Sequence, residues 1–76
     1  LTFKEKFELE ALPAKIEALE AEVEAFRGKL ADPEFYKTAG AETARVTAAL
    51  ETAETALAHA YDRWAELEAI REASGR

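Results

Sequence analysis

Large apolar residues recur at every third or fourth position in the first part of the chain. From Leu9 onward the steps alternate between three and four, through Leu9, Leu12, Ile16, Leu19, Val23, Phe26 and Leu30. This heptad spacing is typical of a helix that packs along a partner helix as a coiled coil. Thr2 and Glu5 form a Thr-x-x-Glu pattern that can cap a helix start. We therefore predict a first helical arm over about residues 3–31.

A second stretch repeats the pattern. Its seam residues are Val46, Leu50, Ala53, Leu57, Ala60, Trp64 and Leu67. Ser74 and Gly75 then form a stop signal, because glycine readily ends a helix. A second helical arm is expected over about residues 41–73.

The two seams are mirror images about the middle of the chain. If the chain reverses near residue 38, every seam residue meets another one: Leu30 faces Val46, Phe26 Leu50, Val23 Ala53, Leu19 Leu57, Ile16 Ala60, Leu12 Trp64, and Leu9 Leu67. Small Ala53 and Ala60 opposite branched Val23 and Ile16 allow close approach of the helices. The pattern favours an antiparallel two-helix hairpin, and the alternative uses the same heptads between two chains.

Breaker residues separate the arms. Asp32 can cap a new helix and Pro33 suits its first position, so residues 32–40 are expected to form a tip with one short helical turn. Phe35 and Tyr36 are expected to close the end of the core there. Within the first arm, Pro13 lacks a backbone N–H, and we expect a kink or a new helix start at that point.

Composition supports an all-α fold of a single domain. Of 76 residues, 49% are hydrophobic, and many of these are alanine, whereas only three glycines and two prolines occur. The net charge is −6, which argues against a uniformly basic surface. No stretch is apolar enough to span a membrane. The absence of an initiator methionine suggests a piece of a longer protein, and the isolated domain is expected to be monomeric.

The chain offers little for catalysis. It has no cysteine and no glycine-rich phosphate loop, and its single histidine, His59, lies outside the seams. The glutamates lack the Glu-x-x-His pairs of helical-bundle metal sites. We predict no catalytic residue, metal or cofactor in this domain.

An aromatic cluster is expected where the two ends of the hairpin meet. It comprises Phe3, Phe7, Tyr61 and Trp64, with Ile70 beside them. One interpretation is a terminal plug of the core, in which Phe7 and Leu12 cover the Trp64 ring. The other is a docking surface for a partner or for stacked bases.

Basic residues suggest two nucleic-acid contacts. Residues 27–45 contain four basic residues, Arg27, Lys29, Lys37 and Arg45, against three acidic ones, while the rest of the chain is strongly acidic. A comparatively basic tip on an acidic rod can bind phosphates. Lys15 and Arg63, next to Tyr61, form the second candidate. The mirror pairing also places Lys15 towards Arg63, and Glu20 towards Glu54, as like-charged neighbours.

Four strings point to a known family. They are LTFKE at residues 1–5, ELEALP at 8–13, LADPEFY at 30–36 and AYDRWAELE at 60–68. In this order the chain resembles the C-terminal domain of Uup-type ABC-F ATPases, a member of the ABC transporter C-terminal domain family. The resemblance implies a coiled-coil hairpin at the end of a cytoplasmic protein with two ATP-binding cassettes, which bind ATP and Mg²⁺ and hydrolyse ATP outside this fragment.

The resemblance also implies a function. Uup-type proteins are associated with DNA binding and with the ribosome, so the leading hypothesis is a non-catalytic domain that binds DNA or ribosomal RNA. A second hypothesis is an interaction or spacer coiled coil that docks on the ATP-binding cassettes of its own protein. A third is the tRNA-binding C-terminal arm of an aminoacyl-tRNA synthetase.

Overall fold

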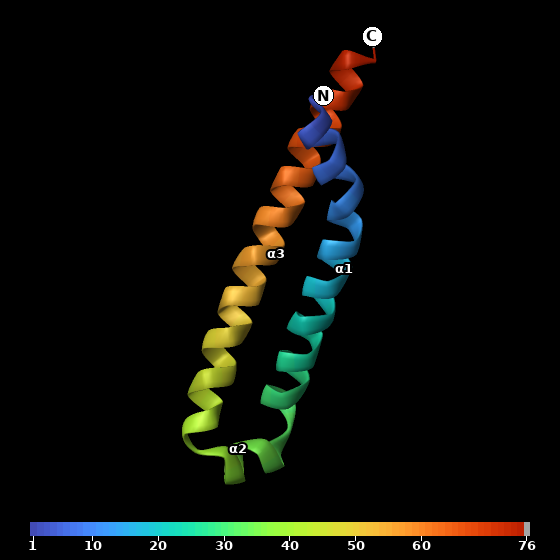
Figure 1. Ribbon diagram of the computed structural model, residues 1–76. Helices are drawn as coiled ribbons and strands as arrows, with labels where there is room; N and C mark the ends of the chain where they lie inside the picture. The colour runs from blue at the N-terminus through green and yellow to red at the C-terminus, as the bar shows by residue number, and fades with distance from the viewer. Residues whose placement is uncertain (76) are drawn as a thin grey trace.

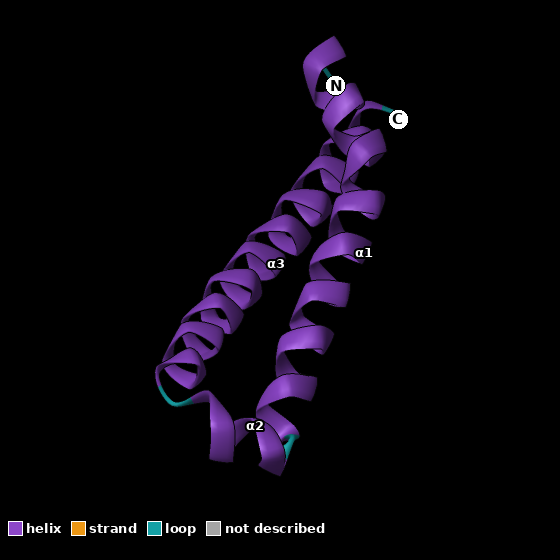
Figure 2. Ribbon diagram, turned by 60° about the horizontal axis from the view of Figure 1, so that its bottom comes forward, coloured by secondary structure: helices purple, strands orange, loops and turns teal. Residues whose placement is uncertain are grey.

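The computed structural model describes the backbone of residues 1–75 and their side chains except that of Ala39. Three helices follow one another, α1 (Phe3–Ala31), α2 (Pro33–Ala39) and α3 (Ala41–Ser74). Helices α1 and α3 run antiparallel, α2 joins them at one end, and both termini lie at the other (Figure 1). Figure 2 shows helices joined by short loops throughout the described part. The predicted antiparallel hairpin is confirmed.

The start of α1 is fixed by a reciprocal cap. The Thr2 hydroxyl accepts the Glu5 backbone N–H at 3.1 Å, and the Glu5 carboxylate accepts the Thr2 backbone N–H at 3.0 Å. Both bonds use donors that no helical carbonyl can reach. Because the Thr2 backbone donates to it, the Glu5 carboxylate has a pKa below its ordinary value.

Two residues separate the helices at the tip. Asp32 ends α1 by donating its N–H to the Lys29 carbonyl at 3.2 Å, and its carboxylate starts α2 by accepting the Glu34 N–H at 3.0 Å. Gly40, at φ 49°, then turns the chain into α3. This left-handed φ favours glycine because a Cβ would crowd the backbone.

Pro13 lies inside α1, which continues through it. The expectation of a new helix start at this residue is therefore wrong, while a kink is still the usual effect of a proline that lacks its N–H and crowds the preceding turn. The side chain of Pro13 is exposed and that of Leu12, before it, is buried. The heptad phase is thus the same on both sides of the proline.

The core is a single seam between α1 and α3. Each predicted stripe contributes four buried residues. Those of α1 are Leu9, Leu12, Ile16 and Val23, and those of α3 are Val46, Ala53, Ala60 and Leu67. The remaining seam residues are half-buried. Every residue that the heptads placed at the interface is thus at least partly buried.

Packing is concentrated towards the termini. A buried cluster at this end joins Leu9, Leu12, Ile16, Ala60 and Leu67, with Leu1, Trp64 and Ile70 among the side chains packed against it. Helices α1 and α3 lie closest at this end and diverge towards α2 (Figures 1 and 2). The molecule is a rod of 57 × 15 × 14 Å. Over residues 1–75, no helix is long and apolar enough to cross a membrane.

Candidate functional site

Three exposed cations lie at the tip, one on each helix. Lys29 is in the last turn of α1, Lys37 is in the last turn of α2, and Arg45 is near the start of α3. Within residues 1–75, Lys29 and Arg45 form no ion pair, and Lys37 has one long contact of 3.8 Å to Glu34. An exposed pair of this length contributes little, so all three cations are available to a ligand.

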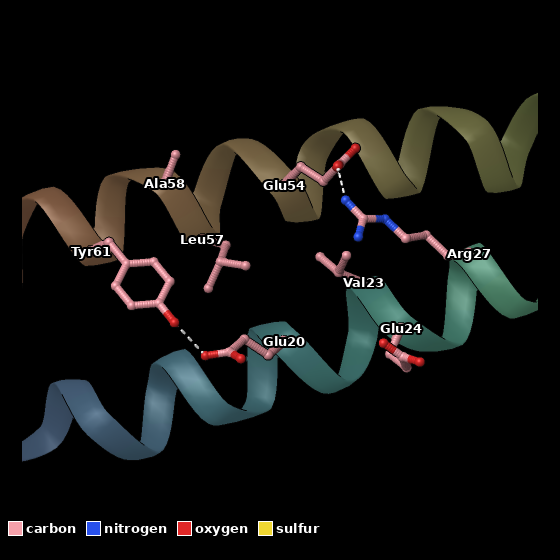
Figure 3. Close-up of a pocket in the computed structure, with 8 residues that line it drawn as sticks. All are labelled: Glu20, Val23, Glu24, Arg27, Glu54, Leu57, Ala58 and Tyr61. Carbon is pink, nitrogen blue, oxygen red and sulfur yellow. Dashed lines mark hydrogen bonds and ion pairs between the residues drawn. The ribbon is translucent and has the colours of Figure 1, made fainter.

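Arg27, the fourth predicted cation of the tip, is already engaged across the hairpin. Its Nη2 atom donates to the Glu54 carboxylate at 2.7 Å. Two turns further along, the Tyr61 hydroxyl donates to Glu20 at 2.6 Å, and the two bonds flank a groove of about 370 Å³ between the arms (Figure 3). The bond to Glu20 raises the pKa of Tyr61. Arg27 therefore already has a partner on the opposite arm.

Arg63 is engaged as well. Its Nε and Nη2 atoms donate to the two Glu8 carboxylate oxygens at 2.7 and 3.0 Å, and Nη1 donates to Glu66 at 2.9 Å. This two-pronged geometry is the strongest arrangement of a guanidinium and a carboxylate. The hydrogen bonds from Arg63 lower the pKa of Glu8, and Glu8 raises that of Arg63. Lys15, its predicted companion, is exposed.

The bonds across the arms explain how the expected like-charged neighbours are accommodated. With Leu9 at heptad position a, Glu20 and Arg27 occupy position e, as do Glu54 and Tyr61 on the other arm. In an antiparallel pair e faces e and g faces g. Glu20 accepts from Tyr61 and Glu54 accepts from Arg27, so each of the two expected like-charged neighbours has a donor on the opposite arm.

The aromatic cluster at the termini is divided between core and surface. Trp64 and Ile70 are half-buried against the core, whereas Phe3 is 86% exposed, Phe7 68% and Tyr61 42%. The prediction that Phe7 covers the Trp64 ring is wrong. Phe3 and Phe7 occupy heptad positions b and f, which point away from the seam. These two rings form an exposed apolar patch.

One tip residue was misplaced by the sequence reasoning. Phe35 is half-buried at the end of the core, as expected, but Tyr36 is 56% exposed. Their rings meet edge to face with centroids 6.4 Å apart and an interplanar angle of 77°. Consecutive residues on a helix point about 100° apart, so a Phe-Tyr pair could have indicated that one ring faces the core and the other solvent.

Known proteins match almost the whole chain. The ABC transporter C-terminal domain family matches residues 1–69. The ATP-binding protein Uup of Escherichia coli (strain K12) is 39% identical over 71 residues, which are 93% of this chain and 11% of that protein.

Two proteins of Haemophilus influenzae are also similar. ATP-binding protein Uup and ATP-binding protein Uup-like are each 40% identical over 68 residues, or 90% of this chain, and the matched part is 10% and 15% of their lengths. The chain thus spans 10–15% of the length of the relatives it matches. No solved structure matches it significantly. The chain belongs to the ABC transporter C-terminal domain family.

Proposed function

We propose that this chain is a non-catalytic nucleic-acid-binding domain whose tip contacts the phosphates of DNA or ribosomal RNA. The observation that supports this most directly is the convergence of exposed Lys29, Lys37 and Arg45 from three helices on one end of an acidic rod. Cations bind phosphates without reading sequence, and the acidic shaft repels the same backbone. Contact would therefore be confined to the tip.

The domain would act as an appendage of an ATP-binding protein. Two of its relatives are named ATP-binding protein Uup, and the segment that matches this chain is about a tenth of each relative's length. In this proposal a cytoplasmic parent hydrolyses ATP with Mg²⁺ in cassettes outside this chain, and the hairpin positions those cassettes on nucleic acid. Membership of the ABC family favours this function over the arm of a tRNA synthetase.

Charge reversal at the tip tests the proposal. Fluorescence anisotropy of labelled duplex DNA and ribosomal RNA fragments, titrated at several salt concentrations, gives the affinity and its salt slope. Each phosphate contact contributes about 0.9 to that slope on duplex DNA. We expect Lys29→Glu and Arg45→Glu each to weaken binding and to lower the slope by about 1.

Lys4→Glu is the matched control, because it makes the same change of charge at an exposed position of α1 at the far end of the rod. The control is expected to lower affinity only slightly, through long-range charge. Equal losses for Lys4→Glu and Lys29→Glu would show that net charge, and not the tip, governs binding. Failure of the unaltered chain to bind at low salt would refute the proposal.

The exposed patch of Phe3 and Phe7 supports a second candidate function, docking on the ATP-binding part of the same protein. Phe3 and Phe7 are 86% and 68% exposed, and contact of such large apolar rings with water is unfavourable. Aromatic side chains are also enriched at the centres of protein interfaces. Phe7→Ser is expected to abolish docking, measured by cross-linking within the full-length protein, with helicity unchanged. Docking that survives both Phe3→Ser and Phe7→Ser would refute this candidate.

A further inference from the structure

Tyr36 places an exposed aromatic ring at the tip that carries Lys29, Lys37 and Arg45. It lies on α2, between the ends of α1 and α3, and is followed in the chain by Lys37. The other strongly exposed aromatic rings, Phe3 and Phe7, are at the opposite end of the rod. The tip therefore combines cations with one accessible planar side chain, the two components of surfaces that bind single-stranded nucleic acids.

The ring has one aromatic neighbour without being part of the core. Phe35 closes the end of the seam and meets the Tyr36 ring edge to face, with centroids 6.4 Å apart. Tyr36 has only two side-chain torsions to restrict and already has a neighbour on one side, so the entropy lost on stacking against a ligand is small. No hydrogen bond to the Tyr36 hydroxyl is made by the residues that the structure describes. Its exposure is thus unrelated to any internal polar contact.

The chemistry of the ligand follows from the ring. In a continuous duplex the base faces are covered by their neighbours, whereas unpaired bases in loops, gaps and single strands are free to stack on an aromatic side chain. On the basis of the proposed function, we propose that Tyr36 stacks on an unpaired base and that the tip prefers single-stranded segments over continuous duplex. Lys29, Lys37 and Arg45 would hold the flanking phosphates.

Two substitutions of Tyr36 distinguish stacking of its ring from the effect of side-chain size. Tyr36→Leu keeps an apolar side chain and helix propensity but removes the planar face, while Tyr36→Phe keeps that face and loses only the hydroxyl. Because Tyr36 is 56% exposed, both variants are expected to remain folded, which far-UV circular dichroism checks. Binding of the 76-residue chain is measured by anisotropy to a labelled DNA strand, the RNA strand of the same sequence, and the DNA duplex.

We expect Tyr36→Leu to weaken single-strand binding by about 5- to 150-fold, the range for loss of one stacked base, with an unchanged salt slope. Tyr36→Phe should bind as the unaltered chain does, and duplex binding should be the same for all three proteins. A stronger effect on the DNA or the RNA strand identifies the source of the unpaired base. Lys29→Glu should instead lower the salt slope for every ligand.

The outcomes distinguish this inference from the proposed function. Base stacking is refuted if Tyr36→Leu weakens single-strand and duplex binding equally, or if it weakens neither. In that case, a loss of binding in Lys29→Glu would still support the tip as a phosphate-binding surface. If the unaltered chain prefers duplex, the inference is also wrong. If it binds none of the three ligands, the proposed function fails and the inference fails with it.

Discussion

Replacing Leu67 by alanine tests whether the hairpin is held together at its terminal end. Leu67 is 0% exposed and belongs to the buried cluster near the termini, which Leu9 and Leu12 of α1 also join. Substitution of a fully buried leucine by alanine costs about 2–5 kcal/mol, through lost burial and the cavity left behind. A chain of 76 residues has a free energy of unfolding of about 4–11 kcal/mol, so the substitution removes a large part of it.

Leu50→Ala is the matched control. It makes the same chemical change in the same helix and seam, but Leu50 is only half-buried and lies near the tip, where α1 and α3 diverge. Its cost is expected to be about 1–2 kcal/mol, because less apolar surface leaves the core.

Thermal unfolding followed by circular dichroism measures both variants. For a domain of this size each kcal/mol lowers Tm by about 4–8 °C, so Leu67→Ala at about 3 kcal/mol should lose about 12–24 °C and Leu50→Ala clearly less. A Leu50→Ala variant that is as unstable as Leu67→Ala would refute the concentration of packing at the termini. Near-native stability of Leu67→Ala would refute the pairing of the two seams.

Three further predictions concern single side chains. Arg63 lowers the pKa of Glu8 below 4.5, so the pair stabilises the fold fully above pH 4.5. Its contribution is lost as the pH falls through the lowered pKa. The free energy of unfolding of Glu8→Gln, measured with urea, should therefore depend less on pH in this acidic range. The Tyr61 phenol, with a pKa raised above 10.0 by Glu20, stabilises the fold fully below pH 10 and less as the pH rises; ultraviolet titration of Glu20→Gln should return its pKa towards 10, and no change would contradict the bond. Pro13→Ala restores a helical N–H at an exposed position and should raise Tm, whereas a lower Tm would show that the proline ring packs favourably.

The residues that end and start the helices at the tip could be predicted from the sequence. Asp32 and Pro33 act through short-range geometry, one as a capping carboxylate and the other through its fixed φ, and each acts where the chain pattern placed it. The roles of Arg27, Arg63 and Tyr36 were not predictable in the same way. A sequence shows that a residue is basic or aromatic but not whether a partner from a distant segment already occupies it.

The sequence by itself determined the two helices, their seams and their antiparallel order, because heptad spacing depends only on the helical repeat and burial of apolar surface dominates the folding free energy. The tertiary structure alone decided which side chains remain free. Arg27 pairs with Glu54 and Arg63 with Glu8 across α1 and α3, and on α2 Phe35 is half-buried while Tyr36 is exposed. These pairings depend on which side chains of a distant segment come within reach, and exposed charge pairs are too weak to determine them in advance.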